Sequence, residues 1–257
     1  MTPAEALASA ALLSVSAQGR DARRFGQRPV RSPHHSASAV ALVGGGSPPR
    51  PGEISLAHGG VLFLDELPEF PRSALEALRE PLETGQITLS RAAAQAQYPA
   101  RFQLVAAMNP CPCGWLGAPA ASARQCVCNG EAVRRYQARL SGPLLDRIDM
   151  RIEVPALRPA ELLPVAGGGP GAAAQESSAP VAARVRGARG RQLARQGVPN
   201  ALLGAAQIDG GLRLTEGARA LLEQVAERLG WSARSLHRVA RVARTVADLA
   251  AADEVEP

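Results

Sequence analysis

Two adjacent carboxylates that follow a short apolar run could take part in the hydrolysis of a phosphate ester. Asp65 and Glu66 come directly after Val61-Leu62-Phe63-Leu64, and Gly59-Gly60 precedes that run. The pattern predicts a buried strand with polar groups at its carboxyl end. There, one carboxylate can bind the water shell of Mg²⁺ while the next orients and deprotonates a water, as in the Walker B motif. A surface turn after a core strand is the alternative interpretation.

Two further polar residues are placed where such a site needs them. Asn109 ends the next predicted core strand, directly before Pro110, and its amide could hold the attacking water or the γ-phosphate. Arg147 stands between apolar residues and could reach a neighbouring subunit's phosphate as an arginine finger. The alternatives are a turn residue for Asn109 and a surface ion pair with Asp146 or Asp149 for Arg147.

The four cysteines form two C-x-C pairs, with 12 residues between the pairs. In a reducing compartment such cysteines bind a metal or stay as free thiols, because a disulfide framework does not persist there. Two short thiolate pairs that close a glycine-containing loop can provide a tetrahedral zinc site. The spacing therefore predicts structural Zn²⁺, with unmetallated thiols as the alternative, at Cys111, Cys113, Cys126 and Cys128.

The elements that position these residues follow from helix, strand and turn signals. Residues 1–17 predict a helix with Thr2 as its N-cap. Residues 26–52 are rich in Pro, Gly, Ser and Arg and predict mostly loop. His34 and His35 lie in that loop, and we assign them hydrogen-bonding roles but no catalytic role.

Strands and a helix alternate in the middle of the chain, which predicts an α/β core with a parallel sheet. Its elements are a strand at 61–64, a helix at 71–83 and extended segments at 86–89 and 98–107. Residues 155–180 lack periodicity and predict a linker. Beyond it, helices are predicted at 181–196, 215–229 and 235–251. The predicted parts are therefore an α/β domain at 1–155, a linker at 156–182 and an all-α domain at 183–257.

The charge balance is compatible with a polyanionic partner. All 29 basic residues of the 257 are Arg, against 23 acidic residues, which gives a net charge of +6. An Arg-only surface favours contacts with phosphate or carboxylate, although GC-rich codon usage explains the same composition. A chain without Lys cannot supply the phosphate-binding Lys of a P-loop. The sequence has no apolar run long enough for a membrane helix and no signal peptide pattern, which predicts a cytoplasmic protein without a membrane partner.

Six long segments are similar to one known family. They are residues 28–38 (RPVRSPHHSAS), 51–70 (PGEISLAHGGVLFLDELPEF), 78–91 (LREPLETGQITLSR), 98–112 (YPARFQLVAAMNPCP), 140–148 (LSGPLLDRI) and 232–249 (SARSLHRVARVARTVADL). These segments resemble the ComM/YifB family of magnesium-chelatase-like AAA+ ATPases. The resemblance implies a partial AAA+ P-loop NTPase core, in which helices flank a parallel sheet, followed by a small all-α lid.

The resemblance also implies roles for individual residues, with ATP and Mg²⁺ as cofactors. Asp65 and Glu66 would form the Walker B pair, with Asp65 bound to Mg²⁺ through water. Asn109 would be sensor 1, and Arg147 would be the finger that acts on an adjacent subunit. Arg234 would be the sensor 2 arginine of the lid and would contact an ATP phosphate.

For partners, the resemblance implies DNA and further copies of the chain in a hexameric ring. The segment before the Walker B strand would be the helix-2 insert, and residues 86–98 would form the pre-sensor hairpin. In related motors such hairpins point into the central pore, where Arg91 could contact a nucleic-acid phosphate. A solvated hairpin charge is the alternative for Arg91.

The chain departs from the family pattern at its beginning. Family members carry a Lon-protease-like domain and a G-x-x-G-x-G-K-[ST] loop before the segment that begins here, so we expect a truncated or split reading frame that is inert alone as an ATPase. The first functional hypothesis is an ATP-dependent motor module of a ComM-like DNA branch-migration translocase. The alternative is a non-catalytic AAA+ remnant that binds nucleic acid or partner AAA+ subunits. Magnesium insertion into a porphyrin is disfavoured by the ComM-like segments.

Overall fold

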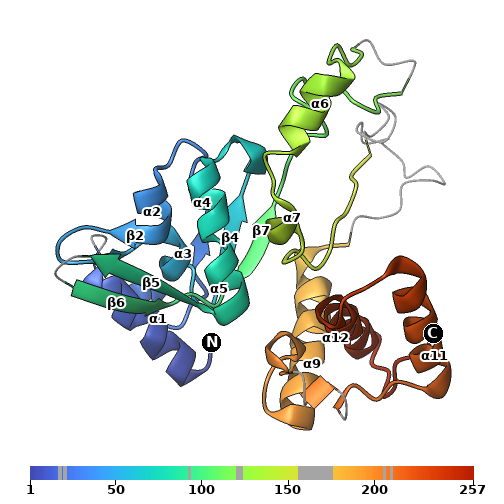
Figure 1. Cartoon of the computed structure of the whole chain (residues 1–257). Coiled ribbons are helices and arrows are strands. Elements are labelled where there is room, and N and C mark those ends of the chain that lie inside the picture. Colours follow the sequence, from blue (N-terminus) through green and yellow to red (C-terminus); the bar gives the residue numbers. More distant parts are fainter. Residues whose placement is uncertain are drawn as a thin grey trace, which may run out of the picture. The chain divides into compact units, whose positions relative to one another are not determined.

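The computed structural model describes residues 1–16, 19, 22–91, 94–119, 124–155, 176–204, 207–208 and 211–257, without the side chains of Arg91 and Ala94. The chain divides into two compact units, residues 1–148 and 149–257 (Figure 1). The first unit is an α/β structure, and the described part of the second is helical. An α/β core followed by a helical region is the partial AAA+ architecture that the sequence predicts.

A parallel three-stranded sheet forms the centre of the first unit, in the order β1-β4-β7. β1 (Val30–Arg31) pairs with β4 (Val61–Leu64), which pairs along its length with β7 (Gln103–Ala106). Gly60 permits the close approach of the segments that lead into β1 and β4, because a Cβ there would lie 1.9 Å from the carbonyl oxygen of Pro29. Since all three strands run in one direction, their carboxyl ends lie at the same edge of the sheet.

The other described elements of the first unit are helices and two antiparallel ribbons, and among them α6 projects away from the sheet (Figure 1). They are α1 (Pro3–Val15), η1 (Ala22–Arg24), α2 (Ala39–Val43), β2 (Gly44–Gly45), β3 (Arg50–Pro51), α3 (Glu53–Leu56), η2 (Leu67–Glu69), α4 (Arg72–Ala77), α5 (Arg79–Thr84), β5 (Gln86–Arg91), β6 (Ala94–Pro99), α6 (Gly130–Gln137) and α7 (Gly142–Leu145). Ile54, Leu62, Phe70, Leu75 and Ile87 are almost completely buried in the core between them. Thr2 caps α1 as predicted, in a reciprocal pair of hydrogen bonds with Glu5.

Three local predictions for this unit were wrong in detail. The helix predicted at 71–83 is divided into α4 and α5, because Pro81 has no N–H to donate to the carbonyl of Ala77. The extended segment predicted at 98–107 is divided between β6 and β7, where the N–H of Arg101 donates to Nδ1 of His58 at 3.0 Å. β1 lies within the segment predicted as mostly loop.

The second unit contains four described helical elements of three residues or more. They are α9 (Ser178–Gln196), η3 (Asn200–Leu202), α11 (Glu216–Leu229) and α12 (Ala233–Leu249). α9 begins earlier than the predicted 181, because Pro180 lies in its first turn, where no N–H is required. The predicted linker at 156–182 thus overlaps α9, and its residues 156–175 lie outside the described part of the chain. None of the described helices is both long and apolar enough to span a bilayer.

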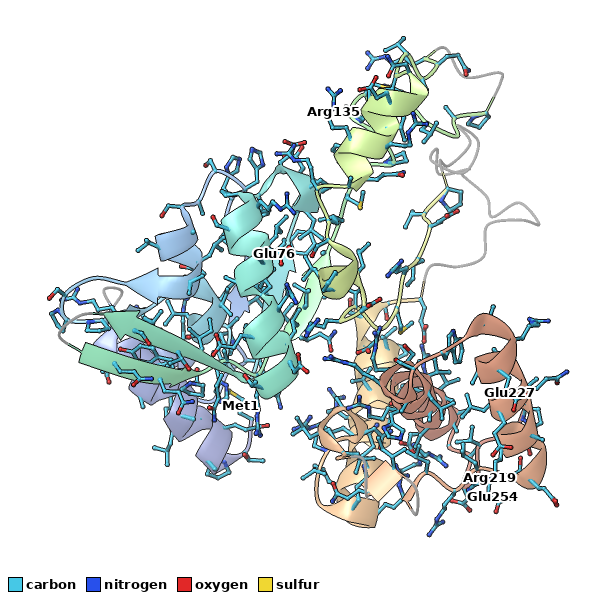
Figure 2. All side chains as sticks on the ribbon, in the orientation of Figure 1. Met1, Glu76, Arg135, Arg219, Glu227 and Glu254 are labelled. Carbon is cyan, nitrogen blue, oxygen red and sulfur yellow. The ribbon has the colours of Figure 1, made fainter. Side chains whose placement is uncertain are left out.

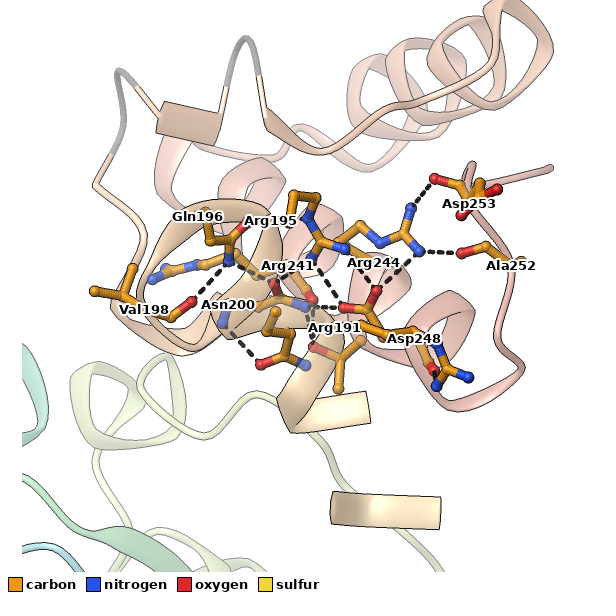
Figure 3. Close-up of polar contacts among 12 residues, drawn as sticks. Arg191, Arg195, Gln196, Val198, Asn200, Arg241, Arg244, Asp248, Ala252 and Asp253 are labelled. Atoms are coloured by element: carbon orange, nitrogen blue, oxygen red, sulfur yellow. Dashed lines mark hydrogen bonds and ion pairs between the residues drawn. The ribbon is translucent and has the colours of Figure 1, made fainter. Parts of the chain in front are cut away.

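A buried network of charges joins the helices of the second unit (Figure 3). Asp248 is completely buried and accepts hydrogen bonds from Arg195 on α9 and from Asn200 on η3, at 2.7 to 3.0 Å. Arg244, one turn earlier on α12, lies 3.0 Å from Asp248 and donates to the carbonyls of Ala252 and Asp253. The network therefore links α9, η3, α12 and the C-terminal segment.

Candidate functional site

Asp65 and Glu66 are exposed at the point where β4 leaves the sheet. The N–H of Glu66 donates to Oδ1 of Asp65 at 2.8 Å, and Glu66 has a φ of 52° and a ψ of 46°. A residue other than glycine rarely adopts this left-handed conformation. Such conformations persist where the surroundings enforce them, and they are concentrated at functional sites.

Asn109 lies beside this pair because β7 is the neighbouring parallel strand. The N–H of Ala107 donates to the carbonyl of Leu64 at 3.0 Å, and the N–H of Leu67 donates to the carbonyl of Ala107 at 2.9 Å. The chain after β4 is thus bonded to the chain after β7, two residues before Asn109. Asp65, Glu66 and Asn109 therefore stand at neighbouring strand ends, as the sequence predicts, and we call these three residues the polar corner.

His35 contacts the polar corner, which the sequence analysis missed. Its Nδ1 lies 2.8 Å from Oε2 of Glu66, and its ring lies against that of His34 with 4.0 Å between the ring centroids. β1 ends four residues before His35, at the same sheet edge as β4. The sequence analysis assigned His35 a hydrogen-bonding role, but it did not identify Glu66 as the partner, because the short strand β1 was read as loop.

Tyr136, on α6, borders the same corner. Burial and the negative charge of Glu69 raise the pKa of its phenol, against a hydrogen bond with the backbone of Asn109 and the positive charge of Arg139. The charge of Glu66 raises this pKa further. Tyr136 therefore lies within the electrostatic reach of both strand ends.

Arg147, directly after α7, is held within the first unit. Its guanidinium pairs with Glu83 of α5 and donates to the carbonyl of Pro143 at 2.6 Å, and its side chain is only 12% exposed. Its Nε is buried without a hydrogen-bond partner among the described residues. The alternative of an ion pair with Asp146 or Asp149 was wrong: α5 brings Glu83 to Arg147, while Asp149 pairs with Arg238 at 2.6 Å.

The two remaining predicted arginines lie away from these contacts in the sequence. Arg234 belongs to the first turn of α12, two residues after its N-cap Ser232, in the second unit. Arg91 is the last residue of β5, in the hairpin formed with β6, as predicted for residues 86–98. The side chain of Arg91 lies outside the described part of the structure.

The four cysteines come together as the sequence predicts. Their sulfur atoms all lie within 4.8 Å of one another, and Sγ of Cys111 lies 3.4 Å from that of Cys113 and 3.8 Å from that of Cys126. Four thiolates around a tetrahedral Zn²⁺, with Zn–S bonds of 2.3 Å, are separated by about 3.8 Å. The cluster can therefore hold a metal without a large rearrangement.

The thiols of the cluster differ in acidity. Hydrogen bonds with the backbone of Trp115 and Val127 lower the pKa of Cys113 to about 6. A backbone hydrogen bond also lowers the pKa of Cys128, but burial and the sulfurs of Cys113 and Cys111 outweigh it and raise this pKa to about 12. One thiolate thus forms readily and disfavours the next, and a bound divalent cation relieves that repulsion.

Comparison with known proteins places the chain in a family. The model described as magnesium chelatase, subunit ChlI, matches residues 1–162, and that of the ChlI C-terminal region matches residues 175–257. Uncharacterized protein YifB of Escherichia coli is 50% identical over 249 residues, and competence protein ComM of Haemophilus influenzae is 47% identical over 250 residues. The chain belongs to the magnesium-chelatase-like ComM/YifB family. Each match covers 97% of this chain and 47% of the relative, so the chain spans about half the length of these proteins.

The polar corner of this ComM/YifB chain fits one part of the cofactor pair that the AAA+ family suggests, ATP and Mg²⁺. Exposed carboxylate oxygens are the ligands that Mg²⁺ prefers, and Asp65 and Glu66 present them at one strand end. The 257 residues contain no lysine, so they supply no P-loop lysine for the β- and γ-phosphates. The carboxylates of the polar corner therefore fit Mg²⁺, whereas these residues do not provide a lysine for the phosphates of ATP.

Proposed function

We propose that this chain carries the hydrolytic corner of a AAA+ ATPase. The observation that supports the proposal best is the position of two carboxylates and one carboxamide at the neighbouring carboxyl ends of parallel strands, in a chain of the ComM/YifB family. Ligands of open α/β sheets bind at this edge. An exposed, left-handed Glu66 contributes nothing to the apolar core, which points to a role in chemistry.

Each residue of the corner has a distinct role in the proposed mechanism. Glu66 orients a water and accepts its proton on a carboxylate oxygen, and His35 holds that carboxylate through its Nδ1. Asp65 holds the water shell of Mg²⁺, and the Asn109 amide donates to the attacking water or to the phosphate. MgATP, when bound, supplies the phosphoryl group and the metal charge that neutralises the developing negative charge.

Two arginines would complete the pocket in a ring of subunits. We propose that Arg147 leaves Glu83 and acts on the phosphate of an adjacent subunit, and that Arg234 contacts a phosphate from the lid. A hexamer is the expected assembly. In a fusion that adds the P-loop segment of a relative, mixing subunits that carry Glu66→Gln with subunits that carry Arg147→Ala should then restore hydrolysis that neither variant has alone, because mixed interfaces regain both groups. Failure to restore it would contradict the action of Arg147 between subunits.

For DNA, we propose that the ring remodels branched DNA through the β5–β6 hairpin. The similarity to a protein named competence protein ComM and the net charge of +6 support this proposal. If Arg91 binds a DNA phosphate, Arg91→Ala should weaken DNA binding and lower the salt slope by about 1. Arg219→Ala, an exposed arginine of α11 (Figure 2), is the matched control and should leave both unchanged.

For the cysteines, we propose structural Zn²⁺ bound by all four thiolates, in a protein of the reducing cytoplasm. The metal would then stabilise the loop that follows Asn109 and take no direct part in hydrolysis. Metal analysis of protein purified without chelator should find about one Zn²⁺ per chain, as one tetrahedral site requires. Loss of zinc in Cys128→Ser would support this ligand set.

A fusion provides the test of ATP hydrolysis. The resemblance to the ComM/YifB family implies that a P-loop precedes the region that this chain matches, so the corresponding upstream part of the E. coli relative is joined to the N-terminus of this chain. We expect MgATP hydrolysis that Glu66→Gln lowers about 100- to 10,000-fold while ATP still binds. Glu131→Gln is the control, because Glu131 is exposed and, in the described part of the chain, pairs with Arg135 one turn along α6, whose side chain is 77% exposed.

The alternative of a non-catalytic AAA+ remnant has its own expected outcome. The 257-residue chain alone should bind ATP weakly, since it offers no lysine to the triphosphate. The fusion would support this alternative if it binds DNA or complete subunits of a relative but does not hydrolyse ATP faster than its Glu66→Gln variant. The hypothesis of an ATP-dependent motor would then be wrong for this chain.

A further inference from the structure

We infer that the four-cysteine metal centre positions Asn109, so that metal binding prepares the polar corner. The inference rests on the proposed zinc site and adds a role that a merely local stabiliser would not have. It requires that the loop at 110–128 be joined to Asn109 at both of its ends.

The first end of the loop is attached directly. Cys111 is completely buried and is separated from Asn109 only by Pro110. The chain then turns back, with the N–H of Gly114 donating to the carbonyl of Cys111 at 3.0 Å. A Cβ on Gly114 would lie 3.8 Å from Cγ of Asn109, so the turn between the cysteine pairs lies against the Asn109 carboxamide.

The second end returns through α6. Cys128 directly precedes Asn129, whose Oδ1 caps α6 by accepting from the N–H of Ala132 at 2.8 Å. Near the other end of the helix, Gln137 donates to the carbonyl of Pro110 at 3.3 Å, and Tyr136 bonds to the backbone of Asn109. The helix that starts at the metal ligands thus ends on the residues beside Asn109.

Further along, Arg139 pairs with Glu69 at 2.8 Å, on the segment that follows Glu66. The loop at 110–128, which carries the four cysteines, is therefore connected to both strand ends of the polar corner. A change in the order of the loop is transmitted to Asn109 through short covalent and hydrogen-bonded paths.

Metal can add order to the described part of this loop. Trp115, Leu116 and Val127 are exposed, with Val127 at 86%, so the loop gains little from apolar burial. Among its described cysteines only Cys111 is buried. Small thiolate sites of this kind obtain their folding free energy from the metal.

Selective ¹⁵N labelling of asparagine tests the inference on the full 257-residue chain. The sequence contains three asparagines, Asn109, Asn129 and Asn200, and Asn200 is buried in the second unit. The side-chain amide signals are assigned by single Asn→Asp substitutions. Metal-free protein is then titrated with Zn²⁺, and a parallel titration with Co²⁺ reports tetrahedral thiolate coordination by its visible absorption.

We expect the Asn109 and Asn129 amide signals to shift with one equivalent of Zn²⁺ while those of Asn200 stay in place. In Cys128→Ser these shifts should be lost, whereas Val127→Ser, which alters the exposed residue between two ligands, should retain them. If Cys128→Ser disturbs folding, the amide signal of Asn200 should change as well. In that case the Zn²⁺ titration of the unsubstituted chain alone tests the inference. Thiolate absorption with an unchanged Asn109 signal would overturn the inference and leave the zinc site standing. Absence of thiolate absorption would overturn both.

Discussion

The polar corner of the first unit and the charge network of the second unit are placed in opposite ways. In the first unit, Asp65, Glu66 and Asn109 are exposed at the edge of a sheet whose core is apolar. In the second unit, Arg244 and Asp248 are buried within the fold itself. Exposed groups at a strand end are free to bind a ligand, whereas buried ion pairs must satisfy one another. The comparison teaches that the exposed carboxylates of the polar corner are available to a ligand, whereas the buried charges around Asp248 hold the fold together.

The size of the apolar core explains why the second unit uses charges. Its described buried cluster consists of Leu203, Ile208, Leu212 and Ala240, whereas the cluster of the first unit extends from Leu42 to Leu144. Helices that share few apolar contacts need hydrogen bonds or ion pairs to hold them together. The hydrogen bonds of Asp248 to α9 and η3 provide it.

The largest expected effect is that of Asp248→Asn. It removes the negative charge between Arg195 and Arg244, and loss of one partner of a buried ion pair costs about 3–5 kcal/mol. Urea unfolding followed by hydrogen exchange of the α9 and α12 peptides measures it. Asp253→Asn is the control, because only the backbone carbonyl of Asp253 accepts from Arg244 and its side chain is exposed. A loss below 1 kcal/mol would show that the network does not hold the second unit together.

A packing change in the first unit should have a smaller effect. Gly60→Ala places a Cβ 1.9 Å from the Pro29 carbonyl oxygen, which accepts the hydrogen bond from Val61 that joins β1 to β4. Overpacking of this kind costs about 1–3 kcal/mol. Gly142→Ala, at the open start of α7, should be neutral, since no atom lies within 4 Å of its Cβ. Equal urea midpoints for the two variants would contradict the tight contact at β1.

The smallest effect is a difference in pH dependence. Burial and the charge of Arg101 lower the pKa of His58, so its contribution to the stability of the first unit is lost as pH falls below about 6.5. Burial alone would raise the pKa of Asp248, but its bonds to Arg195 and Asn200 and the charge of Arg244 lower it. That contribution to the second unit is therefore lost only below about pH 3.9.

Hydrogen exchange at pH 7.5 and 5.5, corrected for intrinsic rates, separates the two units. Peptides around β4 should lose protection at pH 5.5, and those of α12 should not. In His58→Gln, the loss around β4 should become smaller. The reverse order of the two units would contradict the assignment of these groups.

The strong local patterns of the sequence predicted part of the fold and of the site. The apolar run before Asp65 required a buried strand, and the spacing of the four cysteines brought their sulfurs together. β1 escaped prediction because a strand of two residues shows no periodicity, and the contact of His35 with Glu66 was missed with it. Pairs such as Arg147 with Glu83 depend on how distant elements pack, which no local pattern reports.

The buried charges of α12 show the same limit. Arg244 and Asp248 are four residues apart and look like an exposed helical ion pair. Their burial follows from the packing of α9 and η3 against α12, to which Arg195 and Asn200 contribute. The helix itself was predicted, but the role of its charges required the tertiary structure.

The most direct test of the central claim measures two properties of one variant. In the fusion with the upstream part of the E. coli relative, Glu66→Gln should abolish most of the MgATP turnover and change the free energy of unfolding by less than about 0.5 kcal/mol. This result would assign the exposed carboxylate to chemistry and not to the fold. Unchanged turnover, or a loss of stability as large as that of Asp248→Asn, would contradict it.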